Sequence, residues 1–348
     1  MDHYGIRGIA KEWFRSYLSN RSQFVAINGT QSSHKPIIYG VPQGSILGPL
    51  LFVIYINDLP GISDLAKFIL YADDANIIIS GTSIAEITSH VNHITSLLVQ
   101  WVAANGLALN LKKTCYMIFS KSKIRLPDFN ISIDNTTIER KSEARFLGVI
   151  VDERLTWSKH ISALKTKMAR YLGIMYKIKG QLPEKARLLI FQSLVQSHIN
   201  FCSLVWGFAS KTLIEGLFAK QKQGIRAVTS GYVNYKYKDG APPAHTKPYF
   251  AKHDILTVHN VVVKNALTLM HKVRYMPSTL PKSIREIFPD NIPNHESTHE
   301  TCSEWLSTYN SATFITSLFY KGPMLSISPI NSIITIPCLL YTSPSPRD

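Results

Sequence analysis

The stretch Phe68–Ile79 reads FILYADDANIII and decides how the rest of the chain is interpreted. Two runs of β-favouring apolar residues flank the polar tip YADD, which spans Tyr71 to Asp74. This pattern predicts a hairpin with two adjacent carboxylates at its turn. Paired negative charges beside a hydrophobic sheet are costly unless a cation accompanies them, and divalent metal ions are the usual counter-ions. Taken alone, the pair is more often ordinary turn chemistry, because aspartate favours tight turns.

A small-residue loop and an apolar segment precede this hairpin. Residues 40–52 read GVPQGSILGPLLF, in which glycines and prolines predict a tight loop and the apolar remainder predicts a buried helix. Glycine lets a backbone approach a flat ligand closely, and Gln43 and Ser45 offer neutral hydrogen-bonding groups. The loop alone is weak support for a binding site. Its order and spacing before YADD make the combination specific.

The two segments together resemble motifs B (GVPQGSILGPLLF) and C (YADD) of reverse transcriptases, in the wording of non-LTR retrotransposons of the jockey and chicken-repeat type. Leu109–Phe119 (LNLKKTCYMIF) is similar to motif D, and Phe146–Val149 followed by Asp152 is similar to motif E, the primer-gripping turn. Residues 188–206 and 221–226 resemble the helical region that follows the polymerase. The resemblance covers roughly residues 4–290.

This resemblance implies an RNA-directed DNA polymerase that uses Mg²⁺ or Mn²⁺, an RNA template, a DNA primer or target, and dNTPs. Two divalent ions activate the primer hydroxyl and hold the triphosphate in such enzymes. By resemblance, Asp73 is a metal ligand and Asp74 assists in holding the metal. Lys113 is the motif D lysine that protonates the leaving pyrophosphate, with Lys112 as its competitor. A solvated surface charge remains the alternative for either lysine.

The resemblance also assigns binding residues. Gln43, Gly44, Ser45 and Tyr71 would line the nucleotide and template pocket. Leu147 and Gly148 would form the primer grip, with plain sheet core as the alternative for both.

Motif A, an aspartate on a strand, would lie a few tens of residues before Tyr4 in this family, and neither it nor the fingers is in the sequence. We therefore expect a fragment that lacks the N-terminal portion of its polyprotein and makes no DNA by itself. The alternative is a catalytically inactive relic that only binds RNA–DNA duplex. An intron-encoded maturase is a weaker third hypothesis, because the helical pattern after Gly180 disfavours it.

The formal charge of +15 is concentrated in one part of the 348-residue chain. Residues 111–238 hold 23 Lys and Arg against eight Asp and Glu, whereas residues 1–110 hold six against seven. Such a bias is either a solvated face or a nucleic-acid interface. One expected helix carries a series of basic residues that are candidates for following a phosphate backbone: Lys159, Lys165, Lys167, Arg170, Lys177 and Lys179.

The pattern of apolar residues predicts an α+β fold. We expect a partial polymerase palm over residues 1–152, with an antiparallel sheet and helices on one face, followed by a helical thumb-like region over 153–238. A C-terminal helical region would span 239–322, and 323–337 would be irregular. Residues 338–348 (CLLYTSPSPRD) look like a translated sequencing adapter, so we exclude them from the fold.

The same pattern predicts individual elements along the chain. The expected helices are 4–21, Ser83–Asn105 and 249–274, and the expected strands are 23–29, 35–40, 115–119, 131–133 and 145–151. Four scattered cysteines predict free thiols rather than a zinc site. We find no secretion signal and expect no membrane partner; the parent protein would act in the cytoplasm and nucleus, and the location of this chain is left unassigned.

Overall fold

The computed structural model describes residues 2–37, 40–42, 44–119, 130–229 and 245–285, together with the backbone of 332–342. The chain divides into two compact units. Unit 1 contains residues 1–141 and 330–348, and unit 2 contains residues 142–329. The fold is therefore mixed helix and strand, as the sequence predicts at this coarse level.

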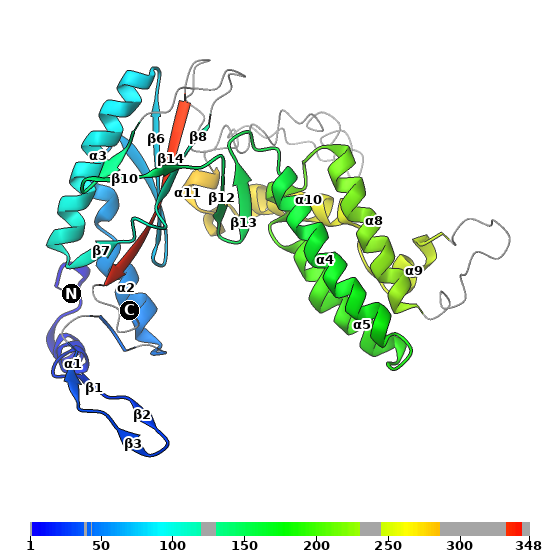
Figure 1. Ribbon diagram of the computed structural model, residues 1–348, viewed down its shortest axis with the longest axis horizontal. Helices are drawn as coiled ribbons and strands as arrows, with labels where there is room; N and C mark the ends of the chain where they lie inside the picture. Colours follow the sequence, from blue (N-terminus) through cyan, green and yellow to red (C-terminus); the bar gives the residue numbers. More distant parts are fainter. Residues whose placement is uncertain are drawn as a thin grey trace. The chain divides into compact units, whose positions relative to one another are not determined.

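Unit 1 is built on a mixed sheet whose strand order is β11-β8-β14-β6-β5, with β7 paired to β14 (Figure 1). Neighbouring strands are antiparallel except for the β11–β8 pair. The strands are β5 (Ala66–Tyr71), β6 (Asp74–Gly81), β7 (Leu107–Leu109), β8 (Cys115–Phe119), β11 (Glu139–Arg140) and β14 (Ser332–Thr342). A small hairpin, β9 (Ser132–Ile133) and β10 (Thr136–Thr137), precedes β11.

Helix α3 (Ile84–Ala104) lies against this sheet and closes the core of unit 1 (Figure 1). Its buried face packs on Ile77 and Ile79 of β6, which are fully buried. Ser83 caps the helix, because its Oγ accepts a hydrogen bond from the Glu86 N–H at 3.2 Å. Both ends of this helix agree with the prediction to within one residue.

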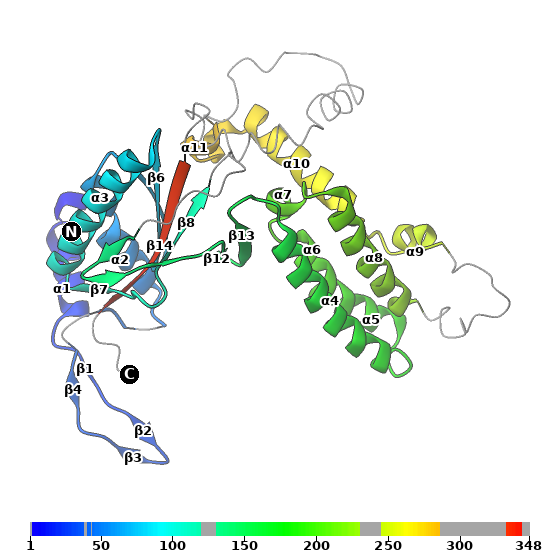
Figure 2. The same cartoon turned by 45° about the horizontal axis from the view of Figure 1, so that its top comes forward.

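Strand β14 is the main correction to the expected fold. We expected residues 323–337 to be irregular and 338–348 to lie outside the fold, but Ser332–Thr342 form a strand between β6 and β8 (Figures 1 and 2). Its backbone pairs with β6 from Ser332 opposite Gly81 to Leu339 opposite Asp74. The physical reason is that β6 and β8 would otherwise leave two rows of backbone groups unpaired.

The N-terminal part of unit 1 contains less helix and strand than expected. In place of a helix over 4–21 there is a 3₁₀ turn, Asp2–Tyr4, and then α1 (Gly8–Leu18). Gly5 and Gly8 have φ values of +76° and +60°, which interrupt a helix at this point. The expected strands over 23–29 and 35–40 are a ribbon of short pairs, β1 (Ser22–Gln23) with β4 (Lys35–Pro36) and β2 (Ala26–Ile27) with β3 (Thr30–Gln31).

Unit 2 combines one hairpin with a bundle of helices, several of which lie side by side in Figure 2. The hairpin is β12 (Glu143–Phe146) with β13 (Val149–Asp152), where we expected one strand over 145–151. The main helices are α4 (Ser158–Ile178), α5 (Glu184–Phe191), α6 (Ser197–Asn200), α7 (Ser203–Trp206), α8 (Lys211–Val228), α9 (Lys247–Lys252) and α10 (Val258–Tyr275). A π-helical turn, Gln192–Gln196, joins α5 to α6, and α11 (Lys282–Arg285) follows α10. The helix expected over 249–274 is broken into α9 and α10.

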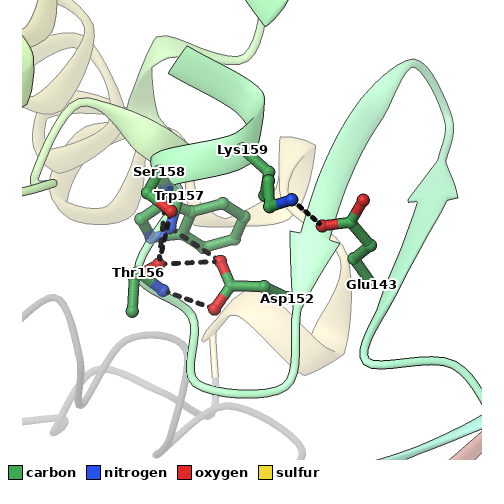
Figure 3. Close-up of polar contacts among 6 residues, drawn as sticks. All are labelled: Glu143, Asp152, Thr156, Trp157, Ser158 and Lys159. Atoms are coloured by element: carbon green, nitrogen blue, oxygen red, sulfur yellow. Dashed lines mark hydrogen bonds and ion pairs between the residues drawn. The ribbon is translucent and has the colours of Figure 1, made fainter. Parts of the chain in front are cut away.

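The hairpin belongs with the helices of unit 2 rather than with the sheet of unit 1. Asp152 at the end of β13 accepts backbone hydrogen bonds from the loop that leads into α4 (Figure 3). Lys159 of α4 forms an ion pair with Glu143 of β12 at 3.6 Å. The second compact unit therefore begins at Ser142, whereas the sequence placed the end of the palm-like region at Asp152.

A buried glutamine joins three segments of unit 2. Gln221 of α8 is fully buried, and its Nε2 donates to Gln196 Oε1 at 2.8 Å and to the Leu256 carbonyl at 2.9 Å. Its Oε1 accepts from the Val258 N–H at 2.9 Å. The amide is therefore fully used, which lets a polar side chain sit in an apolar core. It fixes the start of α10 against α8.

Candidate active site

The YADD segment forms the predicted hairpin turn at the end of the β5–β6 ladder. Tyr71 pairs with Asp74, so Ala72 and Asp73 are the two loop residues. Ala72 has φ +50°, a left-handed conformation that residues with a Cβ adopt only occasionally. Two-residue hairpin loops need this backbone because it matches the twist of the strands. The turn therefore holds both aspartates at one end of the sheet, where the sequence predicted them.

The two carboxylates have different surroundings. Tyr71 and Asp73 are exposed, whereas Asp74 is half-buried at the start of β6. Burial raises the pKa of the Asp74 carboxyl, the negative charge of Asp73 raises it further, and the positive charge of Lys113 lowers it. A nearby cation opposes this rise, as the charge of Lys113 does. Of the two carboxylates, Asp74 is therefore the one that lies partly out of water.

Lys113 lies in the loop between β7 and β8, on the same unit as the turn. This loop is tied by Asn110, whose carbonyl accepts from the N–H of Thr114 at 2.9 Å and whose Oδ1 accepts from the N–H of Lys113 at 3.1 Å. Lys113 is the lysine whose charge acts on Asp74. Its competitor Lys112 is exposed and is not among the causes of the Asp74 pKa shift.

The glycine-rich loop leads into α2 (Leu47–Ile56). Gly40 and Gly44 have φ values of +89° and +78°, so this loop uses the backbone freedom of glycine. The Oγ of Ser45 accepts from the Gly48 N–H at 3.0 Å, which satisfies a free donor in the first turn of the helix. Gln43 lies outside the described residues. The helix that we predicted to be buried is only partly buried, since Ile46, Leu50 and Val53 are exposed.

The expected primer-grip residues form the turn of the β12–β13 hairpin. Phe146 pairs with Val149, which leaves Leu147 and Gly148 as the loop, with φ values of +45° and +87°. Positive φ at both loop positions is the signature of the tight hairpin turn that asparagine and glycine normally supply. A leucine there is an uncommon, strained choice. Both residues are exposed, so they are not the plain sheet core that the sequence left as an alternative.

Asp152 anchors this hairpin, a role that sequence patterns did not reveal. Its Oδ1 accepts from the N–H groups of Arg154 and Thr156, at 3.2 and 3.0 Å. Its Oδ2 accepts from the Trp157 N–H at 2.9 Å and from the Thr156 hydroxyl at 3.2 Å (Figure 3). The loop needs this support because Leu155 and Trp157 both have positive φ. An aspartate before a Thr-Trp-Ser sequence is the only local signal for such a turn.

The basic residues predicted on one helix lie on α4 or, for Lys179, at its C-terminal cap. Lys159, Lys167, Arg170 and Lys177 are exposed, and Lys165 is half-buried. Between Ser142 and Thr229 the chain holds 14 Lys and Arg against five Asp and Glu. This excess of positive charge in unit 2 suits a polyanionic ligand.

Within the described ranges, no three His, Cys, Asp or Glu residues gather into a group that could hold a metal ion. The donors present at the turn are the carboxylates of Asp73 and Asp74. Carboxylate oxygens are the ligands that Mg²⁺ prefers, and this ion commonly takes only one or two of them while water and substrate phosphates complete its shell. The donor set therefore fits magnesium. Cys115 and Cys202 are free thiols, as predicted.

Comparison with known proteins agrees with this geometry. Residues 2–151 match the family model described as reverse transcriptase (RNA-dependent DNA polymerase), a span that contains the YADD turn, the glycine-rich loop and the β12–β13 turn. This part of the chain is a reverse transcriptase domain. Its homologues are the RNA-directed DNA polymerases of jockey and other non-LTR retrotransposons, including the R1 type.

Three of these relatives show the extent of the similarity. The RNA-directed DNA polymerase from mobile element jockey of Drosophila melanogaster is 26% identical over 226 residues, which are 62% of this chain and 24% of the relative. The probable RNA-directed DNA polymerase from transposon BS of the same species is 27% identical over 65% of this chain and 25% of the relative. A Pol polyprotein from the type-1 element R1 of Nasonia vitripennis is 26% identical over 54% of this chain and 59% of the relative.

The matched region thus spans about a quarter of the length of the first two relatives. No solved structure is significantly similar to the chain. Among the helices in the described part of the chain, none combines the length and apolarity needed to cross a bilayer.

Proposed function

We propose that the chain supplies the metal-binding turn and the primer-holding hairpin of an RNA-directed DNA polymerase that copies retrotransposon RNA. The single observation that carries the proposal is the YADD turn, where Asp73 and Asp74 stand together and the charge of Lys113 reaches Asp74. In this assignment the two aspartates hold Mg²⁺ or Mn²⁺. When bound, the metal lowers the pKa of the primer hydroxyl and neutralises triphosphate charge.

The remaining site residues bind and orient the substrates. Lys113 donates a proton to the leaving pyrophosphate, and its electrostatic effect on Asp74 supports it over Lys112. Gly44 and Tyr71, and by resemblance Gln43, contact the template and the incoming dNTP. Ser45 supports the loop through its bond to the start of α2.

In terms of the polymerase hand, unit 1 corresponds to part of the palm and the helices of unit 2 to the thumb. The basic face of α4 follows the phosphate backbone of the RNA–DNA duplex. Its exposed lysines and arginine and the charge excess of unit 2 support this assignment. Duplex affinity should then fall steeply with salt, because each neutralised phosphate releases counterions.

Primer extension on an RNA template, with Mg²⁺ or Mn²⁺, tests the enzymatic part of this proposal. We predict that the isolated chain makes no DNA. The reason is that the two aspartates of the YADD turn are the only metal ligands that we assign to it. Extension that disappears in Asp73→Asn would refute the predicted inactivity and support the assignment of the turn. Salt-dependent duplex binding without extension is the result that we expect. If neither extension nor duplex binding is found, the proposed function fails for this chain.

A further inference from the structure

Phe201 presents a half-exposed aromatic ring from a backbone that is fixed on both sides. The residue lies between α6 and α7, and 50% of it is exposed. Its N–H donates to the Ser197 carbonyl at 3.0 Å, and its carbonyl accepts from the indole N–H of the fully buried Trp206 at 2.9 Å. Cys202 follows with φ +50°. A strained backbone held in this way costs free energy, and such strain gathers at binding sites.

The exposed ring lies against the hairpin turn. A Cβ added to Gly148 would stand 3.2 Å from Cε1 of Phe201, closer than ordinary contact allows. A side chain at this position of the turn would therefore displace the ring. The adjoining Leu147 is 38% exposed. We call these three residues, Phe201, Leu147 and Gly148, the Phe201 surface. It combines an aromatic ring with a turn whose residues have positive φ.

The charge around this surface indicates the class of ligand. Unit 2 holds nearly three times as many basic as acidic residues between Ser142 and Thr229. Arg145, on the same hairpin, is exposed and lies close enough to His160 for its charge to contribute to the lowered pKa of that imidazole, after the larger effect of burial. An exposed aromatic ring within a cationic domain is the combination by which proteins hold nucleic acid, since bases stack on the ring while cations meet the phosphates.

We propose that Phe201 is a primer-binding residue that packs against a nucleotide of the primer strand, near its 3′ end, and works together with the Leu147–Gly148 turn. The proposal rests on the proposed function and adds to it a contact from the helical region after β13. The turn alone offers little surface, because Gly148 has no side chain and Leu147 is only partly exposed. The ring of Phe201 supplies the flat face that a base or sugar needs.

The test uses the full chain and a DNA primer annealed to an RNA template, with 2-aminopurine as the 3′-terminal nucleotide of the primer. Fluorescence anisotropy measures affinity, and the emission of 2-aminopurine reports stacking. Phe201→Ala should weaken binding by roughly 5- to 50-fold and make the base brighter, whereas Phe201→Tyr should behave like the wild type. Tyr275→Ala is the matched control, because Tyr275 is a 64% exposed aromatic on α10 of the same unit.

The outcomes separate this inference from the proposed function. If the wild type binds the duplex and Phe201→Ala binds it equally well with unchanged emission, the inference is wrong and the proposed function stands. If the wild type does not bind the duplex, both fail. If Phe201→Ala turns a dimer into a monomer on gel filtration without changing duplex affinity, the surface meets a second copy, and the inference is again wrong. Circular dichroism and rescue by Phe201→Tyr exclude misfolding as the cause of weakened binding.

Discussion

Asp152 should contribute far more to the stability of unit 2 than the other carboxylate of the same hairpin, Glu143. Replacing Asp152 by alanine removes four hydrogen bonds to one ionised acceptor, with lengths of 2.9 to 3.2 Å. Replacing Glu143 by glutamine removes a single exposed ion pair at 3.6 Å. Both residues appear in Figure 3. The comparison therefore sets a turn-forming carboxylate against a surface charge.

The magnitudes follow from the surroundings of the two groups. Each net hydrogen bond contributes about 0.5–1.5 kcal/mol, and the low end applies here because Asp152 is half-buried and water can replace part of what is lost. We expect Asp152→Ala to lower the free energy of unfolding by about 2–3 kcal/mol. Glu143→Gln should cost at most ~0.5 kcal/mol, as is typical of exposed ion pairs. Asp152→Asn should fall between them, because an amide nitrogen cannot accept from the Trp157 N–H.

Urea unfolding followed by tryptophan emission is a suitable assay, since Trp157 and Trp206 are both buried in unit 2. The midpoint should fall for Asp152→Ala with little change in slope. The same variant should bind the primer–template duplex less tightly, because the Leu147–Gly148 turn loses its anchor on α4. A loss of stability no greater than that of Glu143→Gln would refute the assigned role of Asp152.

Three further predictions concern other parts of the chain. Because the pKa of Asp74 is raised, the contribution of this carboxyl to the stability of the fold is complete below its ordinary pKa of 3.8 and is lost as pH rises through its pKa in the folded chain. Lys113→Met should raise the pKa of Asp74 further, whereas Lys112→Met should not change it. Carboxyl NMR titration can measure both effects. Gln221→Leu should destabilise unit 2 by about 2–4 kcal/mol in urea unfolding, because it leaves buried polar partners unsatisfied, and a change below ~0.5 kcal/mol would contradict this. Deleting residues 332–348 should lower the melting temperature of unit 1 and promote aggregation, because the facing edges of β6 and β8 lose their partner; an unchanged melt would show that β14 adds nothing to the fold.

Local patterns predicted the elements whose stability is local. The β5–β6 hairpin and α3 were predicted because alternation, helical periodicity and a serine cap each act within a few residues. Strand β14 was not predicted, because its partners lie far away in the sequence and its own residues follow a long stretch without periodicity. The break at Leu147 was also missed by pattern alone, since leucine is not a turn residue, and only the resemblance to a polymerase motif indicated a turn there.

The candidate site was predicted unevenly for the same reason. Adjacent aspartates between apolar strands are a strong local signal, so the position of the Asp73–Asp74 turn was predicted correctly. Asp152 bonds to the loop before α4, and the ring of Phe201 lies against the hairpin turn; a linear sequence displays neither contact. The roles of Gln43, Gly44, Ser45 and Tyr71 in substrate binding remain predictions.

Mn²⁺ binding to the full chain, measured by electron paramagnetic resonance with Mg²⁺ as competitor, tests the central claim most directly. We predict that the wild type binds Mn²⁺, that Mg²⁺ displaces it, and that Asp73→Asn combined with Asp74→Asn abolishes the bound signal while the fold is kept. Equal Mn²⁺ binding by the wild type and the double variant would contradict the assignment of the YADD turn as a metal site.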